Sequence, residues 1–554
     1  MNKITPTIII WLLTFTSIPA QVEVTAQLAN HPRTIPLIGF NTNAIHDIAT
    51  WTVPAFVDST AYLNPSILRY PGGTLVSYWD WKTGWIKTGI TVIPAYQNIQ
   101  PQILVRADEF KIGLDAANSE ALMVMNILNS NITYELDGLK HGDSLGINIK
   151  YVEIGNEHNL NQDMIPPGTY ASASKIWCDS IKSVFPNSKI CLVGGNPPGN
   201  PHWNDSIFAH SPDFDALALH VYLGADNTDS VFNVARAMQV PFRDLETRIS
   251  QGGFNNIPDS IEIWATEYNL WEGGYGAKPV IAKTWTQALY VTAMNHILLK
   301  NPNIKMLVNN NLTNQDIFAA IDPFTLKILA NGVAMKLLSD VIKGLTSADE
   351  ILFTPNLTTN YSGTIVPKII GWKFSGSNQE NGLIANISKD TLKVSLTSVF
   401  NNSMNYFEYS ADTAFIVNGY SSLNLESGNS TNTLILTPYS ITQIYSTINT
   451  TNLDEISGSN LPKNILLFPN YPNPFNPSTS IKYFIPNNLF VNIGVFDILG
   501  REIRILLNRE ETSGYHSLSW DGKDSNGRGV SSGIYFCVLR SKDIFLTGKM
   551  LYLK

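Results

Sequence analysis

The chain has 554 residues, a formal net charge of -8 and 15% charged residues. No run of lysines or arginines reaches the length of a basic arm, so we expect no nucleic-acid partner. Three cysteines exclude a disulfide framework, and no Cys/His cluster has the spacing of a zinc site. Cys178 and Cys191 can either pair or remain buried free thiols.

The first twenty residues predict an export signal. Lys3 supplies a positive charge, Ile8 to Phe15 form an apolar core, and Ala20 is a small residue before the cleavage point. The apolar stretch is too short to span a bilayer. We therefore assign residues 1–20 to a signal peptide and expect no transmembrane segment in the mature chain.

Residues 21–345 alternate short apolar runs with longer stretches of helical character, which is the pattern of βα units and a parallel sheet. Helices are predicted at Arg106–Asn118, Tyr170–Phe185 and Lys283–Leu299. The predicted strands are Pro36–Asn43, Ser66–Tyr70, Ala121–Asn126, Lys150–Glu157, Lys189–Gly194, Ala216–Tyr222, Ile261–Glu267 and Ile304–Asn310. Eight such units in one domain predict a closed (β/α)8 TIM barrel.

The pattern changes after Leu345. Residues 346–450 contain short alternating runs separated by Asn, Ser, Gly and Thr, which predicts an all-β sandwich. A polar linker follows at residues 451–463, and residues 464–554 predict a small C-terminal β-sandwich domain.

Two glutamates close predicted strands of the barrel. Glu157 ends the fourth strand and Glu267 ends the seventh. Barrel enzymes carry their catalytic groups at the C-terminal strand ends, and a glycosidase needs a pair of carboxylates. At a separation of ~5–5.5 Å, Glu267 would be the nucleophile of a retaining enzyme and Glu157 its acid and then its base. This chemistry uses no metal and no organic cofactor.

Other predicted strand ends offer substrate-binding candidates. Arg69 would keep a nearby carboxylate ionised, or would instead form a structural salt bridge. Asn156 would donate a hydrogen bond to a sugar hydroxyl. His220 and Tyr222 share one face of the sixth strand, where the Tyr222 hydroxyl would bind the nucleophile and His220 could also be a core histidine.

Two further candidates are less specific. Asn126 ends the third strand, although asparagine is common in turns. Trp271 lies in the loop after the seventh strand, where it would stack on a sugar ring or pack the loop. The same two readings apply to Trp79, Trp81 and Trp203.

Together these residues resemble clan A of the retaining glycoside hydrolases, and most closely family 51, the α-L-arabinofuranosidases. The resemblance covers Ser66 to about Asp340. The motifs that carry it are Leu68–Gly73, Tyr78–Trp81, Asp108–Phe110, Met125–Asn126, Glu153–Glu157, Leu219–Tyr222 and Thr266–Trp271. It implies Glu157 as acid/base, Glu267 as nucleophile, and a β-sandwich packed against the barrel.

Two departures from family 51 affect the expected sugar. Members usually have a glutamate at the end of the first strand, whereas Phe40–Asn43 offers amides and no carboxylate. His158–Asn161 replaces the family's Met-Asp-Gly and looks closer to the heparanase-like glucuronidases. The resemblance therefore extends to the catalytic residues and not to the sugar.

The last hundred residues resemble the sorting domain of the type IX secretion system. The resemblance rests on Tyr471–Pro477, Val495–Glu502, Trp520–Gly522, Ser532–Tyr535 and Lys549–Met550. It implies passage through the periplasm, contact with the type IX secretion machinery, and release or attachment at the cell surface.

The leading prediction is a secreted or surface-attached retaining glycoside hydrolase with a carbohydrate substrate, acting as an α-L-arabinofuranosidase. A clan A endoglucanase, xylosidase or glucuronidase is the alternative within the same class. A non-catalytic glycan-binding protein of the cell surface is the alternative of another class.

Overall fold

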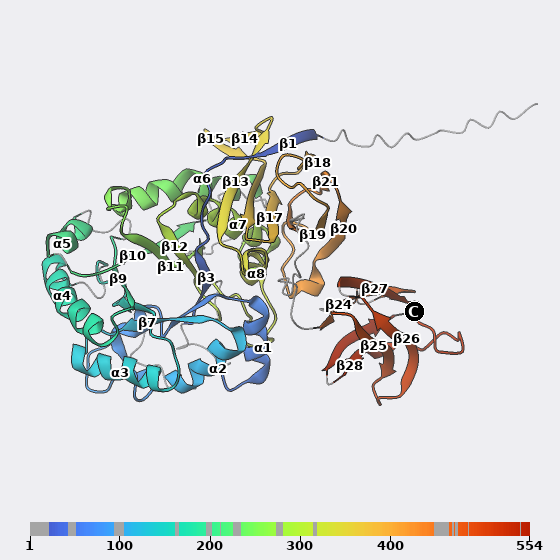
Figure 1. The fold of residues 1–554 in the computed structure, drawn as a ribbon, viewed down its shortest axis with the longest axis horizontal. Helices are drawn as coiled ribbons and strands as arrows, with labels where there is room; N and C mark the ends of the chain where they lie inside the picture. Colours follow the sequence, from blue (N-terminus) through green and yellow to red (C-terminus); the bar gives the residue numbers. More distant parts are fainter. Residues whose placement is uncertain are drawn as a thin grey trace, which may run out of the picture.

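A computed structural model gives the protein's architecture (Figure 1). It describes residues 22–42, 51–93, 105–160, 165–195, 202–210, 212–224, 234–272, 281–313, 318–447, 465–467, 470, 475–485, 487–512, 514–542 and 544–553. The predicted signal peptide and the whole predicted linker lie outside these residues. No helix of the described part is long and apolar enough to cross a membrane.

The first large unit is a closed barrel of eight parallel strands, which confirms the predicted fold class and all eight strands. They are β3 (Leu37–Asn41), β4 (Ile67–Tyr70), β7 (Glu120–Met125), β8 (Tyr151–Ile154), β9 (Lys189–Val193), β10 (Ala216–Gly224), β11 (Glu262–Trp271) and β12 (Ile304–Asn309). Both faces of each strand are covered, which explains why these segments read as apolar runs.

The barrel interior changes character along its axis. Apolar side chains fill its lower part, among them Ile67, Tyr151 and Ala218. Two residues further along the same strands, Arg69, Glu153 and His220 are buried polar groups. Because residues two apart in a strand face the same side, this polar layer lies above the apolar one, toward the C-terminal strand ends.

Helices surround the barrel. They are α1 (Pro54–Leu63), α2 (Ala107–Ala117), α3 (Ile132–Ser144), α4 (Pro167–Val184), α5 (Trp203–His210), α6 (Val234–Gln251), α7 (Trp285–Lys300) and α8 (Ala330–Ile342). Every residue of α7 except Lys300 is buried. A helix that is buried all round needs cover on its outer side as well, and the following β domain supplies it. Trp372 Nε1 of β16 (Ile369–Ser375) donates to His296 Nδ1 of α7 at 2.9 Å.

The second unit is a ten-stranded β arrangement whose main path is β20-β19-β22-β17-β16-β13-β1-β18-β21. Its strands after the barrel are β13 (Ser347–Thr354), β16 (Ile369–Ser375), β17 (Gln379–Asn386), β18 (Leu392–Ser395), β19 (Met404–Ser410), β20 (Asn424–Ser430), β21 (Thr433–Leu436) and β22 (Ser440–Thr447). The strand β1 (Val22–Leu28) inserts between β13 and β18.

The position of β1 changes the domain boundary predicted at residue 21. The segment Val22–Leu28 pairs with β13 and β18 and not with any barrel strand. The short strand β2 (Arg33–Thr34) also pairs with β13. The segment Val22–Leu28 therefore belongs to the β domain, and the chain enters the barrel at β3.

The C-terminal unit contains two small sheets with their own apolar core. One sheet has β23 (Leu466–Leu467), β24 (Thr479–Ile485) and β27 (Gly514–Trp520), and the other has β25 (Leu489–Asp497), β26 (Glu502–Glu511), β28 (Gly533–Ser541) and β29 (Ile544–Tyr552).

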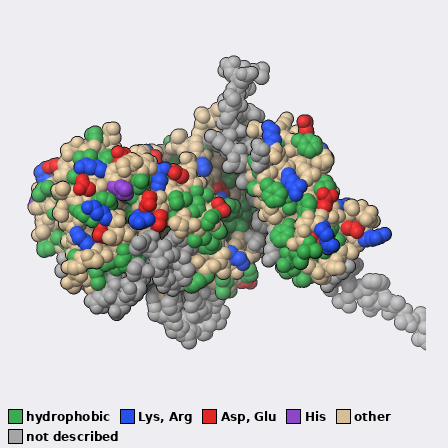
Figure 2. All heavy atoms as spheres, turned by 90° about the horizontal axis from the view of Figure 1, so that it is seen from below, with side chains coloured by type: hydrophobic (Ala, Val, Ile, Leu, Met, Phe, Trp, Pro, Cys, Tyr) green, Lys and Arg blue, Asp and Glu red, His purple; other side chains and the backbone are tan. Residues whose placement is uncertain are grey.

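Acidic and basic side chains are interspersed on the face of the molecule in Figure 2. The described residues of that face thus form no patch of a single charge sign.

Candidate active site

Glu267 lies on β11, where a β-bulge changes the alternation of side chains. Ala218 and His220 of β10 stand opposite Trp264 and Glu267, so β11 carries one extra residue over this interval. The bulge lets neighbouring residues both face the interior: Thr266 Oγ1 contacts Glu153, and Glu267 contacts Arg69. Strict alternation would have directed only one of these two side chains inward.

The Glu267 carboxylate is held at both oxygens. Arg69 Nη1 donates to Oε1 at 2.8 Å, and the Tyr222 hydroxyl donates to Oε2 at 2.7 Å. Asn41 Nδ2 is 3.5 Å from Oε1. These contacts fix the direction of a carboxylate that is only 5% exposed.

Glu157 follows β8 in a tight turn and not within the strand, which ends at Ile154. Gly155 and Glu157 both have positive φ, at 86° and 52°. A non-glycine residue in this region carries strain and is found most often where the fold needs a particular side-chain direction. Here the turn brings Glu157 Oε1 to 3.0 Å from His220 Nδ1.

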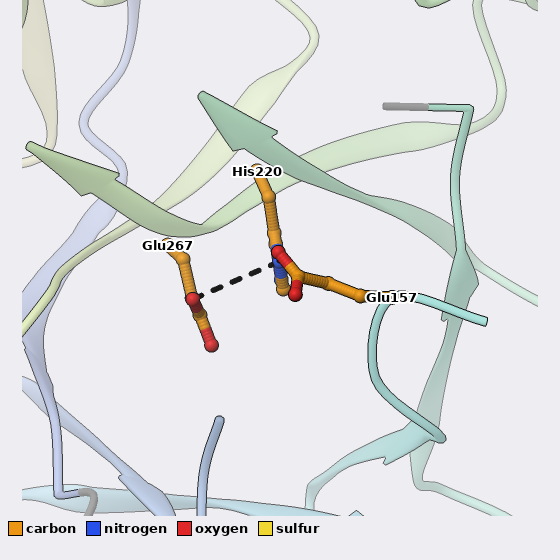
Figure 3. Close-up of side chains that lie close together, drawn as sticks. All are labelled: Glu157, His220 and Glu267. Carbon is orange, nitrogen blue, oxygen red and sulfur yellow. Dashed lines mark hydrogen bonds and ion pairs between the residues drawn. The ribbon is translucent and has the colours of Figure 1, made fainter. Parts of the chain in front are cut away.

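His220 joins the two glutamates (Figure 3). Its Nδ1 lies 3.0 Å from Glu157 Oε1 and 3.8 Å from Glu267 Oε2, and its Nε2 lies 3.0 Å from Thr266 Oγ1. One oxygen of each glutamate and one nitrogen of His220 all lie within 4.8 Å of one another. The structure therefore brings the two predicted carboxylates and His220 into one group.

The charges of this group shift its protonation equilibria. Burial alone would raise the pKa of Glu267, but the positive charges of His220 and Arg69 outweigh it and lower that pKa below its ordinary value. Burial alone would lower the pKa of His220, but Glu267 and Glu157 raise it. Near neutral pH, Glu267 is thus an anion, as a nucleophile must be.

Arg69 is completely buried and all its donors are used. It binds Glu153 through Nε at 2.7 Å and Nη2 at 2.9 Å, Glu267 through Nη1, and Asn156 Oδ1 through Nη2 at 2.8 Å. Nη1 also lies 3.3 Å from Asn41 Oδ1. Arg69 therefore contacts the nucleophile candidate and also forms a buried salt bridge with Glu153, so both of its predicted roles occur together.

Sequence reasoning missed Glu153, Thr266 and Asn41 as parts of this network. Glu153 carried a usable signal: a carboxylate in the middle of a buried apolar strand requires a cation, because an unpaired buried charge is very costly. Asn41 had been noted only for the absence of a carboxylate. It lies among Asn310 and Asn311, which accept from its Nδ2 at 2.8 and 3.2 Å.

The other predicted substrate-binding residues lie in different surroundings. Asn156 is buried, and its Nδ2 has no hydrogen-bond partner among the residues that the structure describes. Asn126 instead organises the loop after β7, since its Nδ2 donates to Trp79 O and its Oδ1 accepts from Asn129 N. Among the described residues, no hydrogen bond joins Asn126 to Glu157 or Glu267.

Trp271 is the last residue of β11, so the prediction that it lies in the loop after the seventh strand is wrong. Its side chain is 52% exposed, and its ring centroid lies 6.0 Å from that of Tyr222. It also lies 5.6 Å from the ring of Phe318. Trp79 and Trp203 are buried, and Trp81 donates to Tyr134 O of α3. Of these four tryptophans, Trp271 is the exposed one, and its neighbour Tyr222 donates to Glu267.

Glu157, His220 and Glu267 together also have the donor set of a metal site. The same geometry serves proton transfer, because His220 stands at hydrogen-bond distance from Glu157. Arg69 lies 2.8 Å from Glu267, and its positive charge opposes a second cation there.

Cys178, Cys191 and Cys537 are buried free thiols, so Cys178 and Cys191 do not pair.

Comparison with solved structures identifies the architecture. An α-L-arabinofuranosidase from Thermotoga maritima, solved with arabinose, has a TM-score of 0.59 at 16% identity and covers 77% of this chain and 100% of its own. A family 51 α-L-arabinofuranosidase from Bifidobacterium longum has a TM-score of 0.61 at 15% identity, over 76% and 99%. The fold is that of the family 51 α-L-arabinofuranosidases.

Two other relatives bear on the barrel. A 4-O-α-L-rhamnosyl-β-D-glucuronidase from Fusarium oxysporum shares the fold with a TM-score of 0.51 at 12% identity, over 76% of this chain and 99% of that one. The intracellular exo-α-(1→5)-L-arabinofuranosidase of Acetivibrio thermocellus is 24% identical over 208 residues. That match spans 32% of this chain and 40% of the relative.

Residues 470–552 match the model of the secretion system C-terminal sorting domain. The small C-terminal β unit is therefore a sorting domain of type IX secretion. It directs the protein to the cell surface or the extracellular space, which confirms the predicted localisation.

Proposed function

We propose that the protein is a retaining glycoside hydrolase that removes α-L-arabinofuranosyl groups, with Glu267 as nucleophile and Glu157 as acid/base. The proposal is carried by the two carboxylates, which have oxygens within 4.8 Å of each other beside His220 (Figure 3). Retaining enzymes place their carboxyl groups roughly 5–5.5 Å apart, whereas inverting enzymes need roughly 6.5–9.5 Å to admit a water molecule.

The reaction takes two steps. Glu267 attacks the anomeric carbon while Glu157 gives its proton to the leaving oxygen, which yields a covalent glycosyl-enzyme and a free alcohol. Glu157, now a carboxylate, takes a proton from water as that water attacks the same carbon and releases Glu267. His220 lies at hydrogen-bond distance from Glu157 and supports both of its protonation states.

Two other groups act on the substrate side. The unpartnered Nδ2 of Asn156 is available to a sugar hydroxyl next to the reacting carbon. The exposed ring of Trp271 offers an apolar surface to a sugar. Asn126, bound within its own loop, is assigned a supporting role in holding that loop.

The arabinofuranosyl assignment is supported by the family 51 fold and by the name of the Acetivibrio relative. A glucuronidase is the second candidate, because the Fusarium structure shares the fold and His158–Asn161 departs from family 51. A uronate needs a cation in its site. The donors of Arg69 are already used by Glu153, Glu267 and Asn156, which favours a neutral sugar.

The test is hydrolysis of aryl glycosides by the full chain and by Glu267→Gln. The panel contains the α-L-arabinofuranoside, β-D-xyloside, β-D-glucoside and β-D-glucuronide. We expect turnover of the arabinofuranoside and a loss of at least ~10³-fold in the variant. Glu262→Gln is the matched control, since it makes the same change at the other end of β11.

Other outcomes separate the alternatives. Turnover of another sugar, lost in Glu267→Gln, would keep the mechanism and replace the arabinofuranosyl assignment. No turnover of any member, with glycan binding equal in both proteins, would favour a non-catalytic surface protein.

A further inference from the structure

Glu153 is a buried carboxylate beside the site that the proposed reaction does not use. It lies on β8 with no exposed surface, and its two oxygens bind Arg69 Nε at 2.7 Å and Arg69 Nη2 at 2.9 Å. A two-point contact of this kind fixes the plane of the guanidinium as well as its distance. Glu153 is therefore placed to determine where the remaining N–H groups of Arg69 point.

The remaining N–H groups of Arg69 point at Glu267 and at Asn156, the residue before Glu157. Nη1 donates to Glu267 Oε1 and Nη2 donates to Asn156 Oδ1, both at 2.8 Å. The contact at Oδ1 also decides which way the Asn156 amide faces, with Nδ2 left unpartnered. Glu153 therefore fixes the orientation of Arg69. Arg69 in turn orients Glu267, the nucleophile candidate, and Asn156, the residue before the acid/base.

Glu153 also acts through its charge. His220 Nε2 lies 4.0 Å from Glu153 Oε1, and Thr266 Oγ1, which contacts that nitrogen, donates to the same oxygen at 3.2 Å. The positive charge of Arg69 alone would oppose a proton on His220. A negative charge beside Arg69 compensates it. The charged or titratable groups that face Glu153 are Arg69 of β4, Cys191 of β9 and His220 of β10. Glu267 of β11 pairs with Arg69, Glu157 after β8 pairs with His220, and Tyr222 of β10 donates to Glu267.

We propose that Glu153 is a positioning residue, which fixes Arg69 against Glu267 and compensates the Arg69 charge so that His220 keeps its proton. The part that concerns Glu267 as nucleophile rests on the proposed function. The coupling to His220 does not, because it is a property of the folded protein.

The first test is an NMR titration of the full chain labelled with ¹³C-histidine. The His220 signal is identified by its loss in His220→Asn. In Glu153→Gln we expect the His220 midpoint to move to lower pH by about one unit, which is the size of the effect of a charge removed at this distance. Glu262→Gln, the same substitution at the opposite end of the barrel, leaves the midpoint in place. An unchanged midpoint in folded Glu153→Gln overturns the proposal.

The second test is the pH dependence of kcat/KM on the aryl α-L-arabinofuranoside. Both limbs of the profile should move to lower pH in Glu153→Gln, because Glu267 and His220 feel the uncompensated charge of Arg69. A lower rate with unmoved limbs shows a merely structural salt bridge and overturns the proposal. Inactive wild-type protein would refute the proposed function, while the titration would still decide the coupling.

Glu153→Asp covers the case in which Glu153→Gln does not fold. It keeps the charge, but the shorter side chain cannot reach both Arg69 nitrogens. We expect its crystal structure to show Arg69 Nη1 displaced from Glu267, with the His220 midpoint unchanged. Retained contact between Arg69 and Glu267 in that structure contradicts the positioning role.

Discussion

His220 in the barrel mouth and His296 between the barrel and the β domain are both buried, and their surroundings move their pKa values in opposite directions. Glu267 and Glu157 overcome the effect of burial and raise the pKa of His220. Burial, together with Lys300 and Arg33, lowers the pKa of His296 to about 3. The barrel mouth thus stabilises the protonated form of His220, whereas the interface stabilises the neutral form of His296.

The partners of each ring explain the difference. Trp372 donates to His296 Nδ1, so that nitrogen acts as an acceptor and the single ring proton lies on Nε2. Nε2 lies 3.4 Å from Glu350 Oε1, and Lys300 pairs with the same oxygen at 3.3 Å and offsets its charge. Carboxylate oxygens lie within 4.0 Å of both nitrogens of His220. An acid-facing histidine can exchange protons near neutral pH, which suits a group beside an acid/base.

The largest expected effect on stability tests whether the barrel mouth needs the positive charge of Arg69 to balance its buried carboxylates. Arg69→Met leaves Glu153 and Glu267 buried without their cation, and we expect a loss of about 3–5 kcal/mol in the free energy of unfolding at pH 7. Denaturant unfolding measures this. Lys189→Met removes the cation of a half-exposed pair with Glu262 and should cost no more than about 1 kcal/mol. Equal losses in the two variants would contradict the special role of the buried network.

The next effect tests the interface. Trp372→Phe removes the donor to His296 Nδ1 and leaves a buried acceptor unsatisfied, so we expect a loss of about 1–3 kcal/mol in the free energy of unfolding. Activity should not change, because Trp372 contacts none of the site residues described above. A fall in kcat without a fall in stability would show that the two regions are coupled.

The comparison of the two histidines predicts opposite pH slopes. Folded His220 keeps its proton to higher pH than the unfolded chain, so its stabilisation is complete below about pH 6.5 and falls as pH rises through its raised pKa. His296 binds its second proton less readily in the folded protein than in the unfolded chain. Its contribution to the free energy of unfolding therefore falls as pH drops from about 6.5 toward 3.

Unfolding of His220→Asn and His296→Asn across pH 3–9 measures these slopes against wild type. Each difference should change by up to about 1 kcal/mol per pH unit within its own window. Slopes of the same sign in both variants would refute the contrast between the mouth and the interface.

The smallest effect on stability is expected at the rim of the mouth. Trp271→Ala removes an exposed ring, so the free energy of unfolding should stay within about 0.5 kcal/mol of wild type. If the ring stacks on the substrate, kcat/KM should fall by about tenfold, mainly through KM. An unchanged KM would limit Trp271 to packing against Phe318 and Tyr222.

Much of the barrel could be predicted because its strands are short, continuous and apolar. Glu157 and Glu267 were predicted as strand-end carboxylates for the same reason, although β8 ends three residues before Glu157 and β11 continues four residues beyond Glu267. The β-bulge that precedes Glu267 could not be predicted, because it depends on the register of β11 with β10. The turn at Glu157 likewise appears only as backbone geometry.

Pairings between distant segments were also hidden. The strand β1 joins β13 and β18, which lie more than three hundred residues further along the chain. The contact between His296 and Trp372 links a helix of the barrel to a strand of the β domain. Such contacts leave no local pattern, so only the folded chain reveals them.

The stereochemistry of the reaction tests the central claim most directly. Proton NMR in the first minutes of hydrolysis records whether the released sugar has the anomeric configuration of the substrate. The proximity of Glu157 and Glu267 predicts retention, with the inverted anomer appearing only later through mutarotation. The inverted anomer as first product would contradict Glu267 as a nucleophile.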